Sequence, residues 1–227
     1  MKRAVCLLSG GMDSAVTIAI VKKEGYEIYA LTFEYEQIHN KEVGCAIRLA
    51  RDFSVKEHKI FYLDLGRIVK SALTGDDEIP MDRDVEEIKK QKRIPKTYVP
   101  ARNTIFLSLS LAYAETVDAD AIFIGAHAVD YSGYPDCRPE YFKKFQGVAN
   151  LATKRAVEGK RIEIRTPLIN CDKAEIVKKG FELGVDFGHT WSCYKGDKLP
   201  CGRCDSCVLR LNGFREAGYN DPLEYEK

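Results

Sequence analysis

The stretch that decides the fold is SGGMDS, residues 9–14. An apolar run, residues 4–8, ends abruptly at this stretch, and helix-compatible apolar residues follow it over 16–20. The order predicts a buried strand, a sharp turn and a helix. Two adjacent glycines let the backbone turn and let a ligand approach without meeting a Cβ. Because the first N–H groups of a helix and its positive dipole end favour an anion, the stretch predicts phosphate binding.

The residues that flank the two glycines favour a bound phosphate over an empty turn. An isolated Gly-Gly pair is more often a strand-to-helix turn without a ligand. Here Ser9 and Ser14 add hydroxyl donors, and Asp13 can cap the helix or help to hold a metal ion on a phosphate. The predicted nucleotide contacts are Leu8, Ser9, Gly10, Gly11, Met12, Asp13, Ser14, Ala15, Val16, Thr17 and Ile18.

The absence of two known motifs excludes two kinds of phosphate-binding site. A Walker loop carries a lysine after its second glycine, and a dinucleotide-binding turn has the pattern G-x-G-x-x-G. Residues 9–14 have neither feature. They resemble the pyrophosphate loop of the N-type ATP pyrophosphatases, the PP-loop superfamily, which cleave ATP to AMP and pyrophosphate while adenylating a substrate oxygen. That resemblance implies adenylation chemistry, whereas the spacing alone indicates only an anion.

The composition is that of a globular α/β protein, and its net charge does not favour binding to nucleic acid or to a membrane. The 227 residues are 45% hydrophobic, and 35 basic against 34 acidic residues give a net charge of +1. The basic start, residues 1–11, has too short an apolar run for a signal peptide. No stretch approaches the roughly 20 apolar residues of a membrane span. We therefore expect a cytoplasmic protein.

Short apolar strands alternate with helices along the chain, which predicts a doubly wound parallel sheet. After residues 4–8, the predicted strands are 26–33, 58–65, 121–126 and 161–166. The predicted helices after the first are 40–53, 104–116, 140–157, 172–184 and 205–216. Ligands of such sheets bind beyond the carboxyl ends of the strands, where the glycine turn lies.

Residues 74–97 interrupt this alternation with a charged run between Pro80 and Pro95. Two interpretations stay open for this segment. It is a mobile excursion that orders over the site, or it is a solvated surface loop.

Three polar residues stand where an anion would bind. Arg102 and Asn103 lie at the start of the helix predicted for 104–116. An arginine there opposes the helix dipole, which indicates a functional reason: it would bind a carboxylate or a phosphate. Lys173 follows the fifth strand and either reaches the nucleotide phosphates or is a surface lysine, and the sequence leaves both open.

The loop after the fourth strand, residues 127–139, is dense in polar and aromatic residues. A pocket for a planar, hydrogen-bonding heterocycle needs such aromatic faces, carboxylates, and an arginine for an anion. A structural omega loop is the alternative. With the two residues at the helix start, the candidate substrate contacts are Arg102, Asn103, Asp130, Tyr131, Ser132, Gly133, Asp136 and Arg138.

Four of the eight cysteines crowd into residues 193–207 with the spacing C-x7-C-x2-C-x2-C. Short C-x-x-C steps form a tight knuckle, and a fourth thiolate closes a tetrahedron suited to zinc. Because a four-thiolate shell leaves no open position, we expect one structural Zn²⁺ per chain. It would staple a C-terminal subdomain, 188–227, to an α/β domain over 1–187. The predicted ligands are Cys193, Cys201, Cys204 and Cys207, and His189 is not needed.

Several stretches together resemble the 7-cyano-7-deazaguanine synthase family of queuosine and archaeosine precursor synthesis. They are SGGMDS (9–14), YVPARN (98–103), VDYSGYPDCRPE (129–140), TWSCY (190–194) and CGRCDSC (201–207). The similarity covers nearly the whole chain. Many ATP pyrophosphatases share the first motif, whereas YSGYPDCRPE joined to the four-cysteine tail is specific to this family.

The resemblance implies a ligase that converts 7-carboxy-7-deazaguanine and ammonia to the nitrile. ATP adenylates the carboxylate, ammonia displaces AMP to give an amide, and a second adenylation drives nitrile formation, with Mg²⁺ as the charge neutraliser. Asp13, Arg102 and Lys173 are the catalytic candidates, with Arg102 as the partner of the carboxylate. No general base stands out, so positioning and charge neutralisation would supply most of the rate.

The chain departs from the family pattern in two places. The loop after the second strand is Tyr35-Glu36-Gln37-Ile38-His39, where the family pattern is Tyr-Gly-Gln-Arg-His. His127 stands where the family often has asparagine. Bacterial members are homodimers, and no stretch of this sequence identifies a dimer interface.

Two other classes of protein compete with this interpretation. One is another PP-loop adenylating enzyme, such as a tRNA thiolase or an amidotransferase synthetase domain, and the other is a zinc-stapled nucleotide-binding module without activity. A thiolase needs a free cysteine pair and a basic RNA-binding face. The clustered cysteines leave no pair over and the net charge is +1, so we expect neither a nucleic acid nor a membrane partner.

Overall fold

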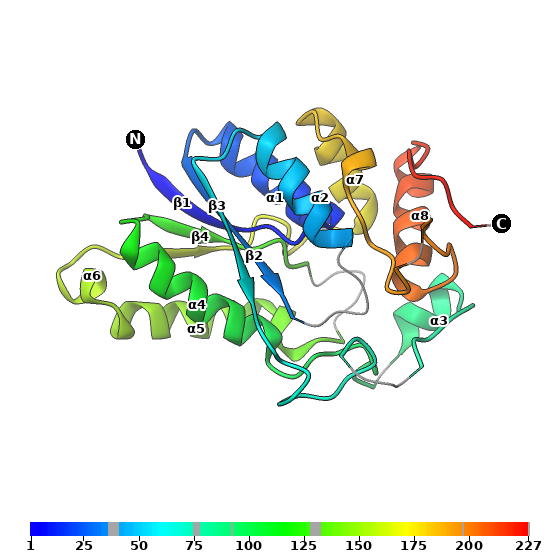
Figure 1. The fold of residues 1–227 in the computed structure, drawn as a ribbon, viewed down its shortest axis with the longest axis horizontal. Coiled ribbons are helices and arrows are strands. Elements are labelled where there is room, and N and C mark those ends of the chain that lie inside the picture. Colours follow the sequence, from blue (N-terminus) through cyan, green and yellow to red (C-terminus); the bar gives the residue numbers. More distant parts are fainter. Residues whose placement is uncertain (36–40, 75–77, 92, 128–132, 197, 227) are drawn as a thin grey trace.

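Five parallel strands form one sheet in the computed structural model, which describes residues 1–35, 41–74, 78–91, 93–127, 133–196 and 198–226. The strand order is β3-β2-β1-β4-β5 (Figure 1). The bounds are β1 Arg3–Leu7, β2 Glu27–Glu34, β3 Glu57–Tyr62, β4 Ala121–Phe123 and β5 Glu163–Arg165. Every neighbouring pair is parallel, so the predicted doubly wound sheet is confirmed.

The strand order reverses direction at β1. The chain first winds outward through β2 to β3, and then crosses to the other side for β4 and β5. The carboxyl ends of β1 and β4 therefore form a topological switch point, which is where open α/β sheets bind ligands. The glycine turn, residues 9–14, follows β1 directly at this point.

Helices cover both faces of the sheet (Figure 1). Alternate residues of β1 point to opposite faces: Cys6 joins a core with α1, α2 and α7, and Val5 joins a core with α4 and α5. The helices are α1 Met12–Lys23, α2 Lys41–Asp52, α3 Val85–Lys90, α4 Arg102–Thr116, α5 Pro139–Ala152, α6 Lys154–Val157, α7 Lys173–Glu182 and α8 Asp205–Ala217, with 3-10 turns η1 Pro135–Cys137 and η2 Phe187–His189. Among the described residues, no helix combines the length and the apolar character needed to cross a bilayer.

The prediction of one helix over residues 140–157 is wrong, because the chain breaks at Thr153. That residue is extended, with ψ of 141°, so α5 ends before it and α6 starts after it. Its hydroxyl donates to the Ala149 carbonyl at 3.0 Å and accepts from the Ala156 N–H at 3.3 Å. Threonine at a helix N-cap makes this second bond, and it starts the new helix.

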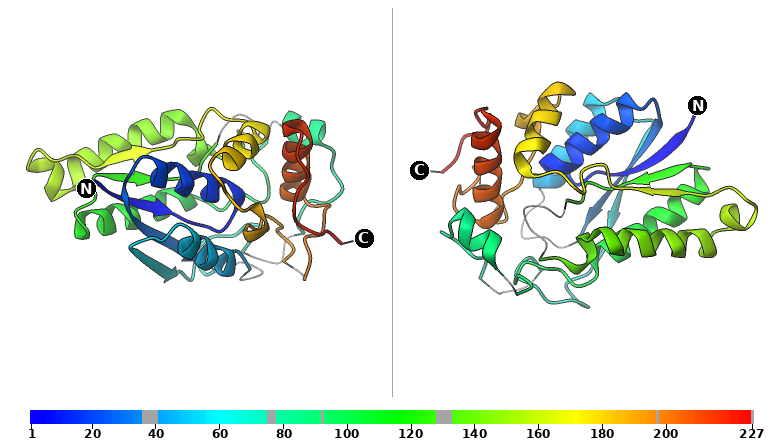
Figure 2. Two further views of the ribbon diagram at one scale, coloured as in Figure 1. Left: turned by 90° about the horizontal axis from the view of Figure 1, so that it is seen from above. Right: turned by 180° about the vertical axis from the view of Figure 1, so that it is seen from behind.

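Residues 78–91 of the charged excursion (74–97) are docked on the C-terminal segment, with α3 beside α8 in all views (Figures 1 and 2). Arg203 donates to both carboxylate oxygens of Asp82, at 2.6 and 2.5 Å. Arg83 donates to both oxygens of Asp205, from Nε at 3.0 Å. Residues 78–91 line no part of the central cavity, and most of their charged side chains are exposed, as the surface interpretation expected. The segment also packs beside the cysteine cluster and forms the short helix α3, which neither interpretation included.

A buried ion pair fixes the C-terminal tail. The Arg210 side chain is 1% exposed and donates to the two carboxylate oxygens of Asp221, at 2.6 and 2.9 Å. It also donates to the Thr190 hydroxyl at 2.7 Å and to the Phe187 carbonyl at 3.1 Å. One guanidinium therefore holds α8, the segment before the cysteine cluster and the tail together.

Arg210→Ala is expected to lower the free energy of unfolding by about 3–5 kcal/mol, because it leaves the Asp221 carboxylate buried without its counter-charge. Urea denaturation measures this loss. The control is Lys154→Ala, which removes an exposed pair with Glu158 and should cost less than about 0.5 kcal/mol. Equal urea midpoints for Arg210→Ala and the wild type would show that the pair does not hold the tail.

Candidate functional site

The glycine turn is held by its own serines. Ser9 Oγ accepts from the Gly11 N–H at 3.2 Å and donates to Ser14 Oγ at 3.1 Å. Ser14 Oγ in turn donates to the Gly11 carbonyl at 2.8 Å. Gly11 is the N-cap of α1 and has no side chain to cap it, so the first N–H groups of the helix are left to a ligand. This geometry suits an anion.

The turn is also locked against α2. Gly10 has φ of +90°, and a Cβ at this position would lie 2.0 Å from the Glu42 carbonyl oxygen. Its own carbonyl accepts from the Trp191 N–H at 2.9 Å. Position 10 therefore requires glycine, which tolerates a positive φ and has no Cβ to collide with the Glu42 carbonyl oxygen.

Gly10→Ala is therefore expected to displace the turn, abolish ATP affinity in calorimetry, and lower the free energy of unfolding by about 1–3 kcal/mol. The matched control is Gly44→Ala on α2, where a Cβ meets nothing within 4 Å. That change should stabilise the helix by about 1 kcal/mol and leave ATP binding intact. Wild-type ATP affinity in Gly10→Ala would overturn the assignment of the turn as the phosphate site.

A cavity of ≈ 310 Å³ opens at the switch point of the sheet. Much of its apolar wall comes from β1, β2, the residue after β4 and α4, and includes Leu7, Leu31, Phe33, Phe106 and Ile124. Its polar groups come from the glycine turn, from the starts of α2, α4 and α7, and from the segment after β4, and they include Ser9, Asp13, Glu42, Arg102, His127 and Lys173. A mostly apolar cavity with a few convergent charged groups has the form of a small-molecule site.

Lys173 reaches the glycine turn and pairs with Asp13. Its Nζ lies 2.7 Å from both carboxylate oxygens, and only 12% of its side chain is exposed. His127 Nε2 lies 3.6 Å from Asp13 Oδ2. Burial alone would raise the pKa of the Asp13 carboxyl, but the charge and hydrogen bonds of Lys173, with His127 second, lower that pKa below its usual value. Of the two positions that the sequence left open for Lys173, the structure has the one inside the site.

Arg102 and Asn103 begin α4 at the edge of the same cavity. Arg102 Nη1 donates to the Tyr35 hydroxyl at 2.7 Å. The Asn103 backbone N–H donates to Asp136 Oδ2 at 2.9 Å, and its side-chain amide donates to the Asp136 carbonyl at 3.0 Å. Asp136 is thus buried as the acceptor for the start of α4, in a role that its place in the loop did not reveal.

Other predicted site residues lie apart from the cavity lining. Gly133, Asp136 and Arg138 are absent from the described residues that line it. The side chains of Ala15, Val16 and Ile18 are buried in the core, and the Thr17 hydroxyl donates to the Asp13 carbonyl at 2.8 Å. Any nucleotide on the turn would meet residues 9–14 first. Asp130, Tyr131 and Ser132 lie outside the described residues, and so do residues 36–39 of the loop after β2.

Sequence reasoning missed Glu42, which lines the cavity from the first turn of α2. Burial raises the pKa of its carboxyl to about 7, and the charge of Arg102 partly offsets that rise. Its position in the first turn of a helix that follows a strand end was the signal that could have found it. Tyr35 and Trp191 line the cavity too. Both lie in stretches that the sequence analysis quoted, but neither was predicted as a site residue.

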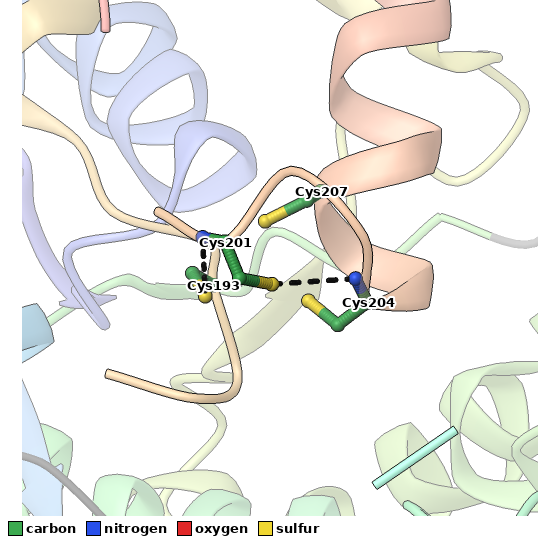
Figure 3. Close-up of side chains that lie close together, drawn as sticks. All are labelled: Cys193, Cys201, Cys204 and Cys207. Atoms are coloured by element: carbon green, nitrogen blue, oxygen red, sulfur yellow. Dashed lines mark hydrogen bonds between the residues drawn. The ribbon is translucent and has the colours of Figure 1, made fainter. Parts of the chain in front are cut away.

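The four cysteines of the C-terminal segment converge in the structure (Figure 3). Their sulfur atoms all lie within 4.8 Å of one another, and all four residues are buried. Backbone N–H groups donate to two of the sulfurs: Cys201 N to Cys193 Sγ at 3.4 Å, and Cys204 N to Cys201 Sγ at 3.4 Å. Gly202, with φ of +70°, makes the turn between them.

This donor set fits a metal ion. Four thiol groups in one buried cluster can close a tetrahedral shell, and the N–H groups favour the thiolate form that binds metal. The predicted ligand set therefore comes together in space, whereas nothing in the described residues adds a fifth donor to it. The segment that carries Cys193 also supplies Trp191, Ser192 and Tyr194 to the cavity wall, so the cluster and the cavity are neighbours.

Comparisons with known proteins agree with this geometry. A protein-family model described as Queuosine biosynthesis protein QueC matches residues 3–218. The 7-cyano-7-deazaguanine synthase of Syntrophus aciditrophicus is 58% identical over 97% of this chain and 96% of that protein. The 7-cyano-7-deazaguanine synthase of Coxiella burnetii (strain RSA 331) is 51% identical over 99% of this chain and 98% of that protein.

Among solved structures, the NMN synthetase from Francisella tularensis superposes with a TM-score of 0.50 and 16% identity, over 96% of this chain and 78% of that one. At that identity the likeness shows the fold alone. The family assignment comes from the sequence matches, which run over nearly the full length of both proteins. The chain belongs to the QueC family of queuosine biosynthesis proteins.

Proposed function

We propose that the chain is an ATP-dependent ligase, a 7-cyano-7-deazaguanine synthase. It converts 7-carboxy-7-deazaguanine and ammonia to 7-cyano-7-deazaguanine and releases AMP and diphosphate. The observation that carries the proposal is the cavity at the switch point, which combines an anion-binding turn with the guanidinium of Arg102. Such a site suits a nucleotide together with a carboxylate substrate. The names of the relatives support the choice of substrate and product.

ATP would lie with its phosphates on residues 9–14. Lys173, which is paired with Asp13 in the absence of nucleotide, would donate to the phosphates, and Asp13 would help to hold Mg²⁺. The ion would supply charge neutralisation for the leaving diphosphate. Arg102 would hold the substrate carboxylate so that one oxygen meets the α-phosphorus, which is catalysis by positioning.

The flat heterocycle would lie against the aromatic part of the cavity wall, where Phe106, Tyr134 and Tyr194 offer ring surfaces. The further substrate contacts in the loop after β4 (Asp130, Tyr131, Ser132, Gly133, Asp136 and Arg138) stay a prediction. Asp136 would contribute by fixing Asn103 at the start of α4, because its carboxylate is already bound there.

The four-cysteine cluster would hold one Zn²⁺ per chain. Zinc accepts four thiolates in a tetrahedron and then has no open position, so its role would be structural. We extend the proposal to the organisation of the chain: residues 188–227 form a zinc-binding subdomain packed on a PP-loop domain of residues 1–187. The enzyme would act in the cytoplasm as a homodimer, and sedimentation of the purified protein tests the oligomeric state.

One assay tests the proposal against its competitors. Zinc-replete protein is incubated with ATP, Mg²⁺, ammonia and 7-carboxy-7-deazaguanine, and diphosphate release and the product mass are measured. Release that requires the deazaguanine and yields the nitrile supports the proposal. Diphosphate release that requires tRNA instead would identify a thiolase. If no diphosphate is released, the protein would be a nucleotide-binding module without activity. Omitting each component in turn is the control.

A further inference from the structure

Among the residues that the structure describes, two carboxylates line the central cavity, and their surroundings differ sharply. Asp13 is bound by Lys173 through both oxygens at 2.7 Å. Glu42 lines the same cavity, and within the described part of the chain its carboxylate forms no hydrogen bond and no ion pair. A carboxylate anchored by an ammonium group is a poor proton acceptor, whereas one without partners in an apolar site keeps its affinity for a proton.

The backbone of Glu42 packs against the glycine turn. Its carbonyl oxygen is packed against Gly10 so closely that a Cβ there would approach it to 2.0 Å. The first turn of α2 is therefore tied directly to the phosphate-binding turn. Across the cavity, Arg102 is the charged group with the largest effect on Glu42. Glu42 thus lines the same cavity as the turn that would bind ATP and the guanidinium that would bind the substrate carboxylate.

The amination step needs a proton acceptor. Ammonia attacks the carbon of the adenylated carboxyl group with its lone pair, and a C–N bond forms while the carbonyl π electrons move to oxygen. The carbonyl then re-forms, the C–O bond to AMP breaks, and the nitrogen is left with one proton too many. That proton must leave before a neutral amide exists, and the nitrogen loses two more when the amide becomes the nitrile.

We propose that Glu42 is the general base of this reaction, taking the proton that the attacking ammonia nitrogen gives up as the amide forms. The inference rests on the proposed function and names a role that its scheme leaves unassigned. One N–H bond breaks, one O–H bond forms on the carboxylate, and the proton returns to solvent between turnovers. The raised pKa of Glu42, about 7, suits this exchange near neutral pH.

A different role for Glu42 makes different predictions. A carboxylate could instead accept hydrogen bonds from the N–H edge of the deazaguanine ring, which would make Glu42 a specificity residue. Loss of that contact would weaken substrate binding before any nitrogen attacks. Loss of a base leaves substrate binding and adenylation unchanged and slows only the ammonia-dependent step.

The test separates these steps in Glu42→Gln with three assays. Substrate-dependent ATP–diphosphate exchange without ammonia reports adenylation, amide formation with ammonia reports the whole step, and hydroxamate formation with hydroxylamine reports attack by a nucleophile that is unprotonated at neutral pH. We expect wild-type exchange, with amide formation and hydroxamate formation each reduced by about 10²–10⁴-fold, because the nitrogen of either nucleophile must lose a proton after it attacks. The control is Asp52→Asn, the same chemical change on α2 at a carboxylate outside the cavity, which should leave all three rates unchanged.

A parallel loss of exchange, hydroxamate and amide in Glu42→Gln would overturn the base and assign Glu42 to substrate binding. Wild-type amide formation would overturn it as well. If the wild-type protein itself showed no deazaguanine-dependent exchange, the proposed function would fail, which is a separate outcome. Should Glu42→Gln not fold, Glu42→Asp keeps a carboxylate at a shorter reach. A loss of amide and hydroxamate formation with wild-type exchange in that variant supports the proposal, and a uniform loss overturns it.

Discussion

Replacing Cys204 by serine is expected to abolish binding of the proposed zinc ion and to destabilise the C-terminal segment. A serine hydroxyl is a far weaker ligand for a soft or borderline metal than a thiolate, and three thiolates do not close the shell. Structural zinc contributes an apparent 10–16 kcal/mol or so to the folding of small zinc-dependent domains, so its loss removes more than any single side-chain contact.

The damage should spread beyond the cluster. Cys204 is the N-cap of α8, and its backbone forms a bridge with Met81 in the docked segment 78–91. Metal content by mass spectrometry, thermal unfolding, and hydrogen exchange in α8 and residues 78–91 measure the effect. We expect less than one metal ion per chain, a lower midpoint and faster exchange in both segments.

The control for this experiment is Cys171→Ser, which also replaces a buried cysteine by serine but lies outside the cluster. It should keep the metal and lose only the cost of a hydroxyl in the core, about 1–3 kcal/mol. A Cys204→Ser protein that retained one metal ion per chain and the wild-type midpoint would rule out a structural four-thiolate site.

The parts of the site that could be predicted are those that one short stretch of sequence carries. The glycine turn needs only its own residues and the strand before it, and the C-x-x-C steps hold three metal ligands within seven residues, 201–207. The parallel sheet followed from the regular alternation of strands and helices, because that pattern allows few topologies. These features can therefore be predicted without knowledge of tertiary contacts.

The parts that could not be predicted depend on which distant segments meet. Lys173 stands 160 positions from Asp13, and nothing near it in sequence distinguishes it from a surface lysine. Glu42 becomes a site residue only because α2 packs on the glycine turn. Residues 78–91 are held beside the cysteine cluster by ion pairs of Arg83 and Arg203 with carboxylates of the other segment. The sequence did not reveal these pairs, because a charged run that forms specific ion pairs looks the same as a solvated one.

Asp13→Asn and Lys173→Met are each expected to lower turnover by about 10²–10³-fold, the usual loss when a charge aimed at the reacting phosphates is removed. The two side chains contact each other in the absence of nucleotide and would act on the same phosphates in its presence. Residues that act as a unit show non-additive losses, because removing one already disables the other. The double variant should therefore be little slower than the worse single variant.

A double-mutant cycle on diphosphate release measures this coupling, with circular dichroism and thermal unfolding to show that each variant is folded. Lys178→Met is the matched control, since it changes an exposed lysine on the same helix and should leave turnover unchanged. Losses that multiply in the double variant would mean that Asp13 and Lys173 act independently. Wild-type turnover in either single variant would exclude the pair from the catalytic machinery, and the partly buried ion pair at the start of α1 would then have no catalytic explanation.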